Sequence, residues 1–315
     1  MQVSIRFTLR QLQYLVTCID TGSLAAAAER LNISQPSIST AIAKLEAELG
    51  VQLLLRHHAQ GVTPTASAER LLQSARSLLS HAADLQRHAK ASGDMIAGDL
   101  RLGSFITLAP AFLPGLMAEL KQHYPALRLQ LGEGTQTQLI DGLRQGRHEL
   151  ALLYDLDLPD DLRSTELAKV APYILLSENH PLAGQEDIAM ADLADEPLIL
   201  LDVPPSRDYF TSLLEDAGIE PRIAFSSPSL ELVRGLVGRG LGYSLLVTRP
   251  SGDISYDGQS LAVCAVREPV KEGRIVLSAL RALRPTRVMS VFEAFAASYF
   301  STALRIGDSS HAGRT

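Results

Sequence analysis

Apolar positions in the first fifty residues recur with the period of an α-helix. Five of them, spaced mostly by three or four, predict a first helix: Leu9, Leu12, Leu15, Val16 and Ile19. A second helix is predicted over 23–31, with Ser23 as its N-cap. A third is predicted from about Gln35 to Leu49, with Ser34 as N-cap and Gly50 as terminator. Only a three-residue turn separates these last two helices.

A long helix is predicted next, over residues 67–90, after a stretch that contains Gly61 and Pro64. Leu71, Leu78 and Leu85 lie seven residues apart, which places them along one seam of that helix. So many leucines on an isolated surface helix predict pairing with a second chain. The alternative is that the helix packs on the rest of its own chain.

After Gly98 the pattern changes to short apolar strands that alternate with helices. Strands are predicted over 100–103, 127–131 and 150–154, and a capping box at Thr135 begins one of the intervening helices. A second unit carries buried strands over 198–201 and 243–247. Alternation of this kind predicts parallel, doubly wound α/β sheets.

These patterns divide the chain into a head, a linker and a body. We expect an all-α head over 1–66, a linker helix over 67–92 and an α/β body over 98–304. The body is expected to have one unit over 98–170 and 271–304 and another over 171–270, because its last strand and helix lack room to form a domain. Residues 305–315 are small and polar, and disorder is expected there.

Composition narrows the class of protein. The 315 residues are 46% apolar and 20% charged, which is typical of a globular protein. No apolar run is long enough to cross a bilayer, and no secretory signal is visible, so we expect a cytoplasmic protein without a membrane. The net charge of −6 divides into +3 for residues 1–92 and −9 for the rest, which indicates different partners for the two parts.

The third predicted helix has one face that is suited to contact with DNA. At about 100° per residue, its apolar residues share one face, and the opposite face is small and polar near its beginning. Two helices joined by a short turn are typical of a helix-turn-helix, whose second helix meets base edges with its N-terminal residues. The candidate DNA contacts here are Ser34, Gln35, Pro36, Ser37, Ser39, Thr40 and Lys44. An ordinary amphipathic surface helix has the same period, so periodicity alone leaves that alternative open.

Four stretches of the head resemble the LysR-type transcriptional regulators: Leu-Arg-Gln-Leu at 9–12, Thr-Gly-Ser-Leu-Ala-Ala-Ala-Ala-Glu-Arg-Leu at 21–31, Ser-Gln-Pro-Ser-Ile-Ser at 34–39 and Lys-Leu-Glu-Ala-Glu-Leu-Gly-Val-Gln-Leu at 44–53. Arg56 matches an arginine of that family, and Gly61, Val62 and Thr65 match its wing. The resemblance implies a winged helix-turn-helix, a dimerising linker helix and an effector domain. That domain would have two Rossmann-like subdomains similar to type 2 periplasmic binding proteins.

The head also departs from the family pattern. Thr40 stands where the family commonly has Arg or Lys, which puts base readout by a bidentate arginine in doubt. Gln35 can still reach an adenine, and Thr40 a thymine methyl group. Arg56 is expected to contact phosphate or the minor groove, and its alternative is a surface ion pair with a carboxylate. Four other departures are Ala43, Leu54, Pro64 and Ala68.

A ligand site is predicted between the two α/β units. In open α/β sheets ligands lie at the carboxyl ends of the strands, where helix N-termini converge. The candidate effector contacts at these ends are Ser104, Phe105, Thr107, Thr135, Tyr154, Asp202, Ser206, Arg207, Ser227 and Tyr243. Their hydroxyls and backbone N–H groups suit a carboxylate or another oxyanion. Each also has a plainer role, as a helix cap, a core side chain or, for Arg207, an ion pair with Asp208 or Glu215.

Other functions have weaker support. The glycines of Gly238-Arg239-Gly240-Leu241-Gly242 precede a predicted strand, so they do not form a dinucleotide loop, and no catalytic cluster can be named. A solute-binding protein would lack the added head. Cys18 and Cys264 cannot build a disulfide framework or a zinc site, and no cofactor is expected. The expected partners are double-stranded DNA, a small effector, further copies of the chain as a dimer or tetramer, and RNA polymerase.

Overall fold

Three helices and a β-hairpin form the head in the computed structural model, which describes residues 5–57, 61–90, 96–250 and 252–309. The helices are α1 (Leu9–Thr21), α2 (Leu24–Leu31) and α3 (Gln35–Leu49), and the hairpin pairs β1 (Leu54–His57) with β2 (Gly61–Pro64). The hydroxyls of Ser23 and Ser34 accept hydrogen bonds from the backbone N–H groups of Ala26 and Ser37, so both predicted caps are confirmed. The hairpin makes the head less than fully helical.

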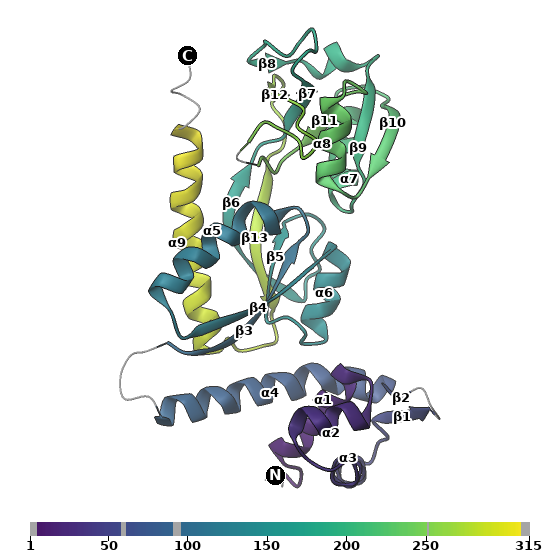
Figure 1. The fold of residues 1–315 in the computed structure, drawn as a ribbon, viewed down its shortest axis with the longest axis vertical. Coiled ribbons are helices and arrows are strands. Elements are labelled where there is room, and N and C mark those ends of the chain that lie inside the picture. Colours follow the sequence, from purple (N-terminus) through teal and green to yellow (C-terminus); the bar gives the residue numbers. More distant parts are fainter. Residues whose placement is uncertain (1–4, 58–60, 91–95, 251, 310–315) are drawn as a thin grey trace.

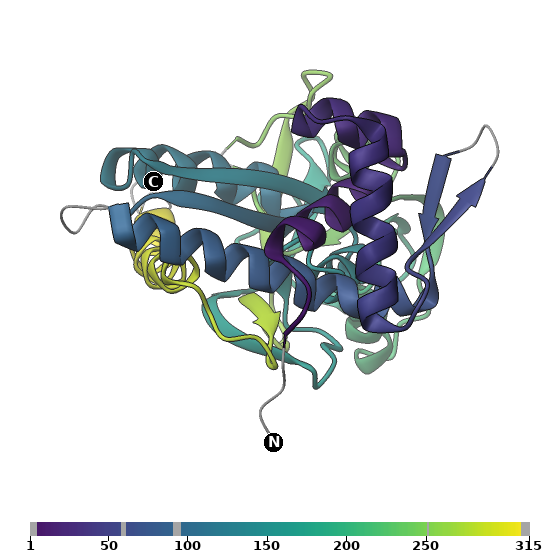
Figure 2. The same ribbon diagram turned by 90° about the horizontal axis from the view of Figure 1, so that it is seen from below.

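The linker helix α4 (Ala66–Lys90) presents three different faces along its length. Ala68, Leu72 and Ala75 are buried in the core of the head. A second face lies against the body, where the Ser80 hydroxyl donates a hydrogen bond of 2.9 Å to Glu149. The third face carries the leucine seam. Figures 1 and 2 show this helix lying across one end of the body.

A mixed five-stranded sheet is the centre of subdomain I. Its strands are β3 (Gly98–Phe105), β4 (Leu127–Gly134), β5 (Leu150–Tyr154), β6 (Leu162–Val170) and β13 (Gly273–Leu280), in the order β4-β3-β5-β13-β6. Helices α5 (Leu108–His123) and α9 (Arg287–Ser309) lie on one side and α6 (Gln136–Arg144) on the other (Figure 1). Residues 98–170 therefore share one core with the final strand and helix.

Subdomain II has two smaller sheets. One has the order β11-β7-β12-β8, from β7 (Tyr173–Ser177), β8 (Asp187–Ile188), β11 (Ser244–Leu246) and β12 (Leu261–Val266). The other pairs β9 (Pro197–Leu201) in parallel with β10 (Arg222–Ser227). Helices α7 (Ser206–Asp216) and α8 (Leu230–Gly238) and the 3-10 helix η1 (Met190–Leu193) complete it. The long strands β6 and β13 connect the two subdomains (Figure 1).

Two features of the body differ from the sequence-based expectation. The five-stranded sheet is mixed, because β13 re-enters subdomain I from subdomain II and pairs antiparallel with both β5 and β6. The connection from β6 to β13 passes through the whole of subdomain II, so it does not return the chain as a βαβ crossover within one sheet would. The four-stranded sheet of subdomain II is mixed as well, because β7 pairs antiparallel with β11 and β12. The second difference is that α9 ends at Ser309, so residues 305–309 of the expected disordered tail are helical. Adding residues to an existing helix costs little free energy, and no proline interrupts the helix here. Residues 310–315 lie outside the described ranges.

Candidate functional site

The polar face of α3 is open to solvent in this chain. Ser34, Gln35, Pro36, Ser37, Thr40 and Lys44 are exposed and Ser39 is half-buried. The opposite face is fixed in the core by Ile38, Ile42 and Leu45, which are fully buried. The first turn holds no acidic side chain, and its N–H groups form the positive end of the helix dipole. This end of the helix is therefore suited to approach a phosphate backbone.

Arg56 lies on the first strand of the hairpin that follows α3. Its side chain is exposed, and no carboxylate among the described residues pairs with it. Across the hairpin, the Nε2 atom of His57 lies 2.9 Å from the hydroxyl of Thr63, so this histidine is held by its own strand pair. The neighbouring His58 lies outside the described residues. The geometry leaves the Arg56 guanidinium available for an external anion.

Two predicted effector contacts of subdomain I, Phe105 and Thr107, lie against the side chain of a third, Tyr154. The tyrosine lies at the end of β5, and its ring meets Phe105 edge-on at 5.5 Å between centroids. Its hydroxyl forms a hydrogen bond with that of Thr248, a residue of subdomain II that the sequence did not single out, and Thr107 interacts with the same hydroxyl. Burial raises the pKa of Tyr154, so the phenol stays neutral and links the two subdomains as a hydroxyl.

The other predicted contacts lie apart from this hydroxyl cluster or serve local structure. Thr135 caps α6 in a capping box, as expected. Arg207 forms ion pairs of 3.1 Å with Asp202 and 3.3 Å with Asp208, which is its plainer role. The remaining members are buried: Ser104, Ser206, Ser227 and Tyr243. Burial raises the pKa of Tyr243 to about 12.

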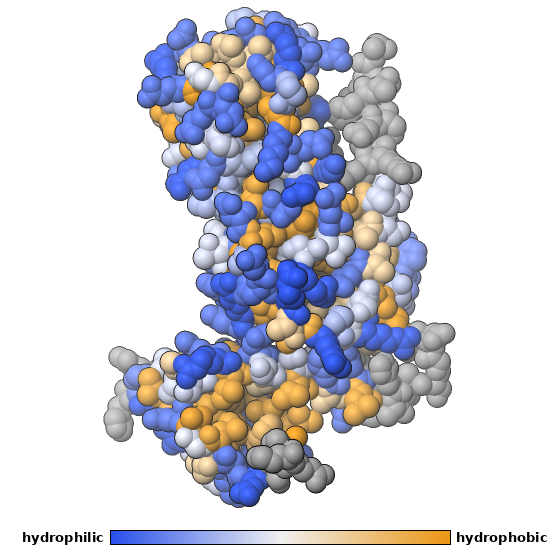
Figure 3. Space-filling view, turned by 180° about the vertical axis from the view of Figure 1, so that it is seen from behind, coloured by the Kyte–Doolittle hydropathy of each residue, from blue (hydrophilic) through white to orange (hydrophobic). Residues whose placement is uncertain are grey.

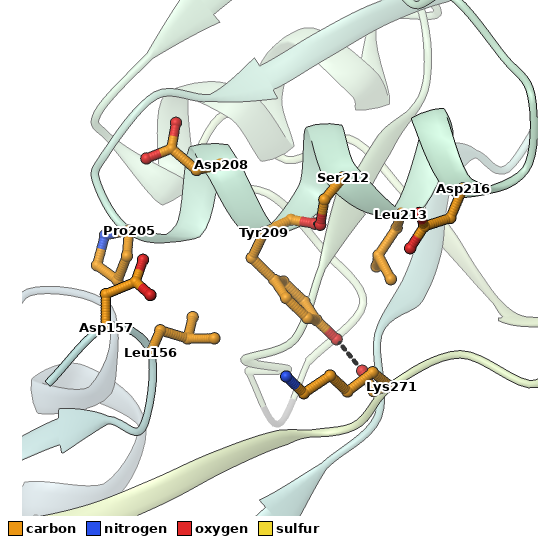
Figure 4. A pocket seen from close by; sticks show the side chains of 9 residues that line it. All are labelled: Leu156, Asp157, Pro205, Asp208, Tyr209, Ser212, Leu213, Asp216 and Lys271. Atoms are coloured by element: carbon orange, nitrogen blue, oxygen red, sulfur yellow. Dashed lines mark hydrogen bonds between the residues drawn. The ribbon is translucent and has the colours of Figure 1, made fainter.

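A cavity of about 210 Å³ opens between the two subdomains (Figure 4). Leu156 and Asp157 form its wall in subdomain I, and residues of α7 form the facing wall. Lys271 closes the side near β13, where its carbonyl accepts a 2.5 Å hydrogen bond from Tyr209. The full lining is Leu156, Asp157, Pro205, Asp208, Tyr209, Ser212, Leu213, Asp216 and Lys271. Several of these residues lie within three positions of the predicted Tyr154 or Ser206, whereas Ser212, Leu213 and Asp216 lie further along α7 and Lys271 lies near neither. No motif identified them.

The two cysteines are poorly suited to redox chemistry. Cys18 is buried in the head, and burial raises the pKa of its thiol to about 11. Cys264 is buried in β12 of subdomain II, and burial raises its pKa as well. Reactive cysteines need an accessible thiolate. Within the described ranges, no cluster of three metal-binding side chains occurs and no helix is long and apolar enough to cross a bilayer.

Known proteins resemble the chain along most of its length. HinK, a LysR family transcriptional regulator from Pseudomonas aeruginosa, is 42% identical, with a TM-score of 0.64 over 94% of this chain and 99% of HinK. A full-length OxyR variant from the same organism has a TM-score of 0.74 at 25% identity, covering 94% of this chain and 98% of that one. The dual regulator OxyR of Escherichia coli is 33% identical over 76% of this chain and 78% of its own.

Two family models match the head and the body separately. The helix-turn-helix of bacterial regulatory proteins of the lysR family matches residues 9–69. The LysR substrate binding domain matches residues 93–301, which is more than half of the chain. The chain therefore belongs to the LysR family of DNA-binding transcriptional regulators.

Proposed function

We propose that Gln35 and Thr40 read base edges while Arg56 binds the phosphate backbone or the minor groove. The observation that carries this proposal is that Arg56 is exposed on the hairpin next to α3 in the chain and pairs with no carboxylate among the described residues, while the N-terminal half of α3 is exposed as well. Side chains on a recognition helix distinguish bases, whereas a basic contact to phosphate adds affinity for every sequence. The two roles therefore predict different mutant phenotypes.

Substitution separates these two roles. Arg56→Ala should weaken binding to operator and random DNA alike and reduce the salt dependence by about one contact per subunit. Gln35→Ala should weaken operator binding selectively, by about 1–3 kcal/mol, and change the preferred base. Fluorescence anisotropy on the DNA upstream of the gene and on shuffled DNA measures both effects. An equal loss on both DNAs for Gln35→Ala removes that residue from base readout.

Pairing of two chains through α4 supplies the second half of the site. Leu71, Leu78 and Leu85 are 38%, 48% and 72% exposed, although leucine is usually buried. Apolar surface gathers on this side of the head and linker in Figure 3. A symmetric dimer would cover this seam, double the DNA contacts and require two half-sites. Two such dimers could pair into a tetramer. The regulator would act in the cytoplasm, where it could also contact RNA polymerase.

A small effector, a carboxylate or another anion, is proposed to enter between the subdomains. The hydroxyls of Thr107, Tyr154 and Thr248 converge there and are the donors that such an anion needs in an acidic body. An anion that replaced the contact between Tyr154 and Thr248 would change the relative orientation of the two subdomains. A coupling of about 1–3 kcal/mol to DNA binding is enough for regulation.

A thermal-shift screen of small carboxylates tests this part of the proposal. A binding carboxylate should stabilise the full chain and change its affinity for DNA. Thr107→Val keeps the shape of the site but removes one hydroxyl, and Thr135→Val does the same at the predicted α6 contact. These variants should respond less to the effector and bind DNA normally without it. Unaltered responses in both variants would place the effector elsewhere.

A further inference from the structure

Glu46 stands at an unfavourable position of α3 for a carboxylate. It lies one turn from the end of the helix, where the dipole is negative, and no basic residue occupies that last turn. Glu48 adds a second negative charge to the same turn. A neutral helix-forming residue would suit this position better on local grounds alone. The carboxylate must therefore gain its stabilisation from outside the helix.

Two backbone N–H groups at the start of the hairpin supply that stabilisation. The Oε1 atom of Glu46 accepts hydrogen bonds of 2.7 Å from the N–H of Leu53 and 3.1 Å from that of Leu54. Both leucines are buried, at 0% and 2% exposure, so water has little access to replace the carboxylate. Charged acceptors make the stronger class of hydrogen bond, and buried unpaired donors are costly. The contact joins the recognition helix directly to the strand that carries Arg56.

The second strand of the hairpin is fixed to a different part of the head. The N–H of Val62 donates a 2.8 Å hydrogen bond to the carbonyl of Gly22, in the turn between α1 and α2. Gly61 approaches that carbonyl so closely that a Cβ atom would lie 2.2 Å from it, and its φ of +91° also favours glycine. Arg56 is the cross-strand partner of Val62. Arg56 therefore lies in a hairpin that is held at both strands, and Glu46 is the residue of α3 that bonds the arginine's own strand.

We infer that Glu46 is a positioning residue for DNA binding, which fixes the Arg56 guanidinium at a set distance from the base-reading face of α3. This inference rests on the proposed contact between Arg56 and DNA. An arginine on a loosely held strand loses conformational entropy when it binds phosphate, and that loss reduces the binding free energy that the contact contributes. A fixed strand lets the helix and the arginine engage the same half-site together. Without Glu46, Arg56 should contribute little.

A double-mutant cycle on the full-length chain measures this dependence. Arg56→Ala is made in the wild-type chain and in Glu46→Asp, which keeps the charge but withdraws the oxygen by one methylene. Affinity for the upstream DNA is measured by anisotropy across a salt series. We expect Arg56→Ala to weaken binding about tenfold in the wild type but less than about twofold beside Glu46→Asp, with the salt dependence reduced by about one contact per subunit in each single variant.

Matched variants separate positioning from mere stability. Glu46→Gln keeps an oxygen acceptor at the same reach and should retain most of the wild-type affinity and salt dependence. Glu48→Ala removes the same charge two residues away, from an exposed side chain, and should leave the Arg56 contribution intact. Thermal melting of each variant shows that the head is folded at the assay temperature. Glu46→Asp leaves the charge of the helix unchanged, which Glu46→Ala would not.

The outcomes distinguish this inference from the proposed function beneath it. If Arg56→Ala has no effect in the wild-type chain, the proposed DNA contact itself is wrong. If Arg56→Ala weakens binding equally in both backgrounds, the contact stands but Glu46 does not position it. Coupling between the two positions, together with rescue by Glu46→Gln, supports the inference.

Discussion

Replacing Leu78 with glutamate tests whether the leucine seam of α4 joins two chains. Leu71, Leu78 and Leu85 together expose the equivalent of about one and a half leucine side chains per subunit. Burying a whole leucine is worth about 1.5–3 kcal/mol, so covering the seam contributes about 2–5 kcal/mol from each subunit. Leu78 lies in the middle of the seam, where a substitution affects both of its neighbours.

The substitution should cost the dimer more than the lost apolar contact. The substitution removes from each subunit the burial of about half a leucine side chain in the dimer. In a two-fold dimer both glutamates must also enter the same apolar seam. We expect at least about 3 kcal/mol in total, which weakens dimerisation by about 100-fold or more. Sedimentation equilibrium across a dilution series measures this change, and DNA binding should weaken with it.

An exposed leucine outside α4 provides the control. Leu55 lies on β1 and is 43% exposed, close to the 48% of Leu78, but it is outside the seam. Leu55→Glu should therefore leave the mass of the assembly unchanged. If Leu78→Glu keeps the wild-type mass at every dilution, the seam does not join the chains, and the exposed leucines need another explanation.

Three further outcomes follow from side chains that the described structure buries wholly or in part. A Cβ added at Gly132 would lie 2.5 Å from Cε1 of His148, and Gly103 and Gly142 approach the same ring. Gly132→Ala should therefore lower the free energy of unfolding, measured by urea titration, by about 1–3 kcal/mol. His148→Ala in the same chain should restore part of that loss. Burial, with nearby Arg147 and Arg101, lowers the pKa of His148 below its ordinary 6.5. Because the unfolded chain then binds the proton more readily, the free energy of unfolding should fall as the pH drops through about 6.5 and level off below the lowered pKa. His148→Leu should lose this pH dependence. Hydrogen peroxide should leave DNA binding unchanged in gel-shift assays, because both thiols are buried with raised pKa values; a peroxide response that Cys18→Ser or Cys264→Ser abolishes would contradict this.

The local features of the head could be predicted from the sequence because their causes are local. Ser23 and Ser34 cap helices through bonds to residues three positions away, and apolar spacing alone places Ile38 and Ile42 in the core. The direction of β13 could not be predicted in this way. It depends on where the chain returns after about a hundred residues of subdomain II, and no periodicity encodes that.

The candidate sites show the same division between local and non-local causes. Tyr154 and Thr107 were found because strand ends and helix starts share one edge of a sheet. Thr248 meets Tyr154 only through the packing of the two subdomains, and the same packing places Lys271 in the cavity wall opposite Leu156. Glu46 was part of a recognised motif, but its bonds to Leu53 and Leu54 require the hairpin to fold back on the helix.

Footprinting of the full-length chain on the DNA upstream of its own gene tests the central claim most directly. A paired helix-turn-helix regulator should protect two half-sites about one helical turn apart or a multiple of it, and related by approximate two-fold symmetry. It should also bind this DNA at least about 10³-fold more tightly than shuffled DNA at physiological salt. Protection of a single unsymmetrical site, or equal affinity for shuffled DNA, would contradict the account.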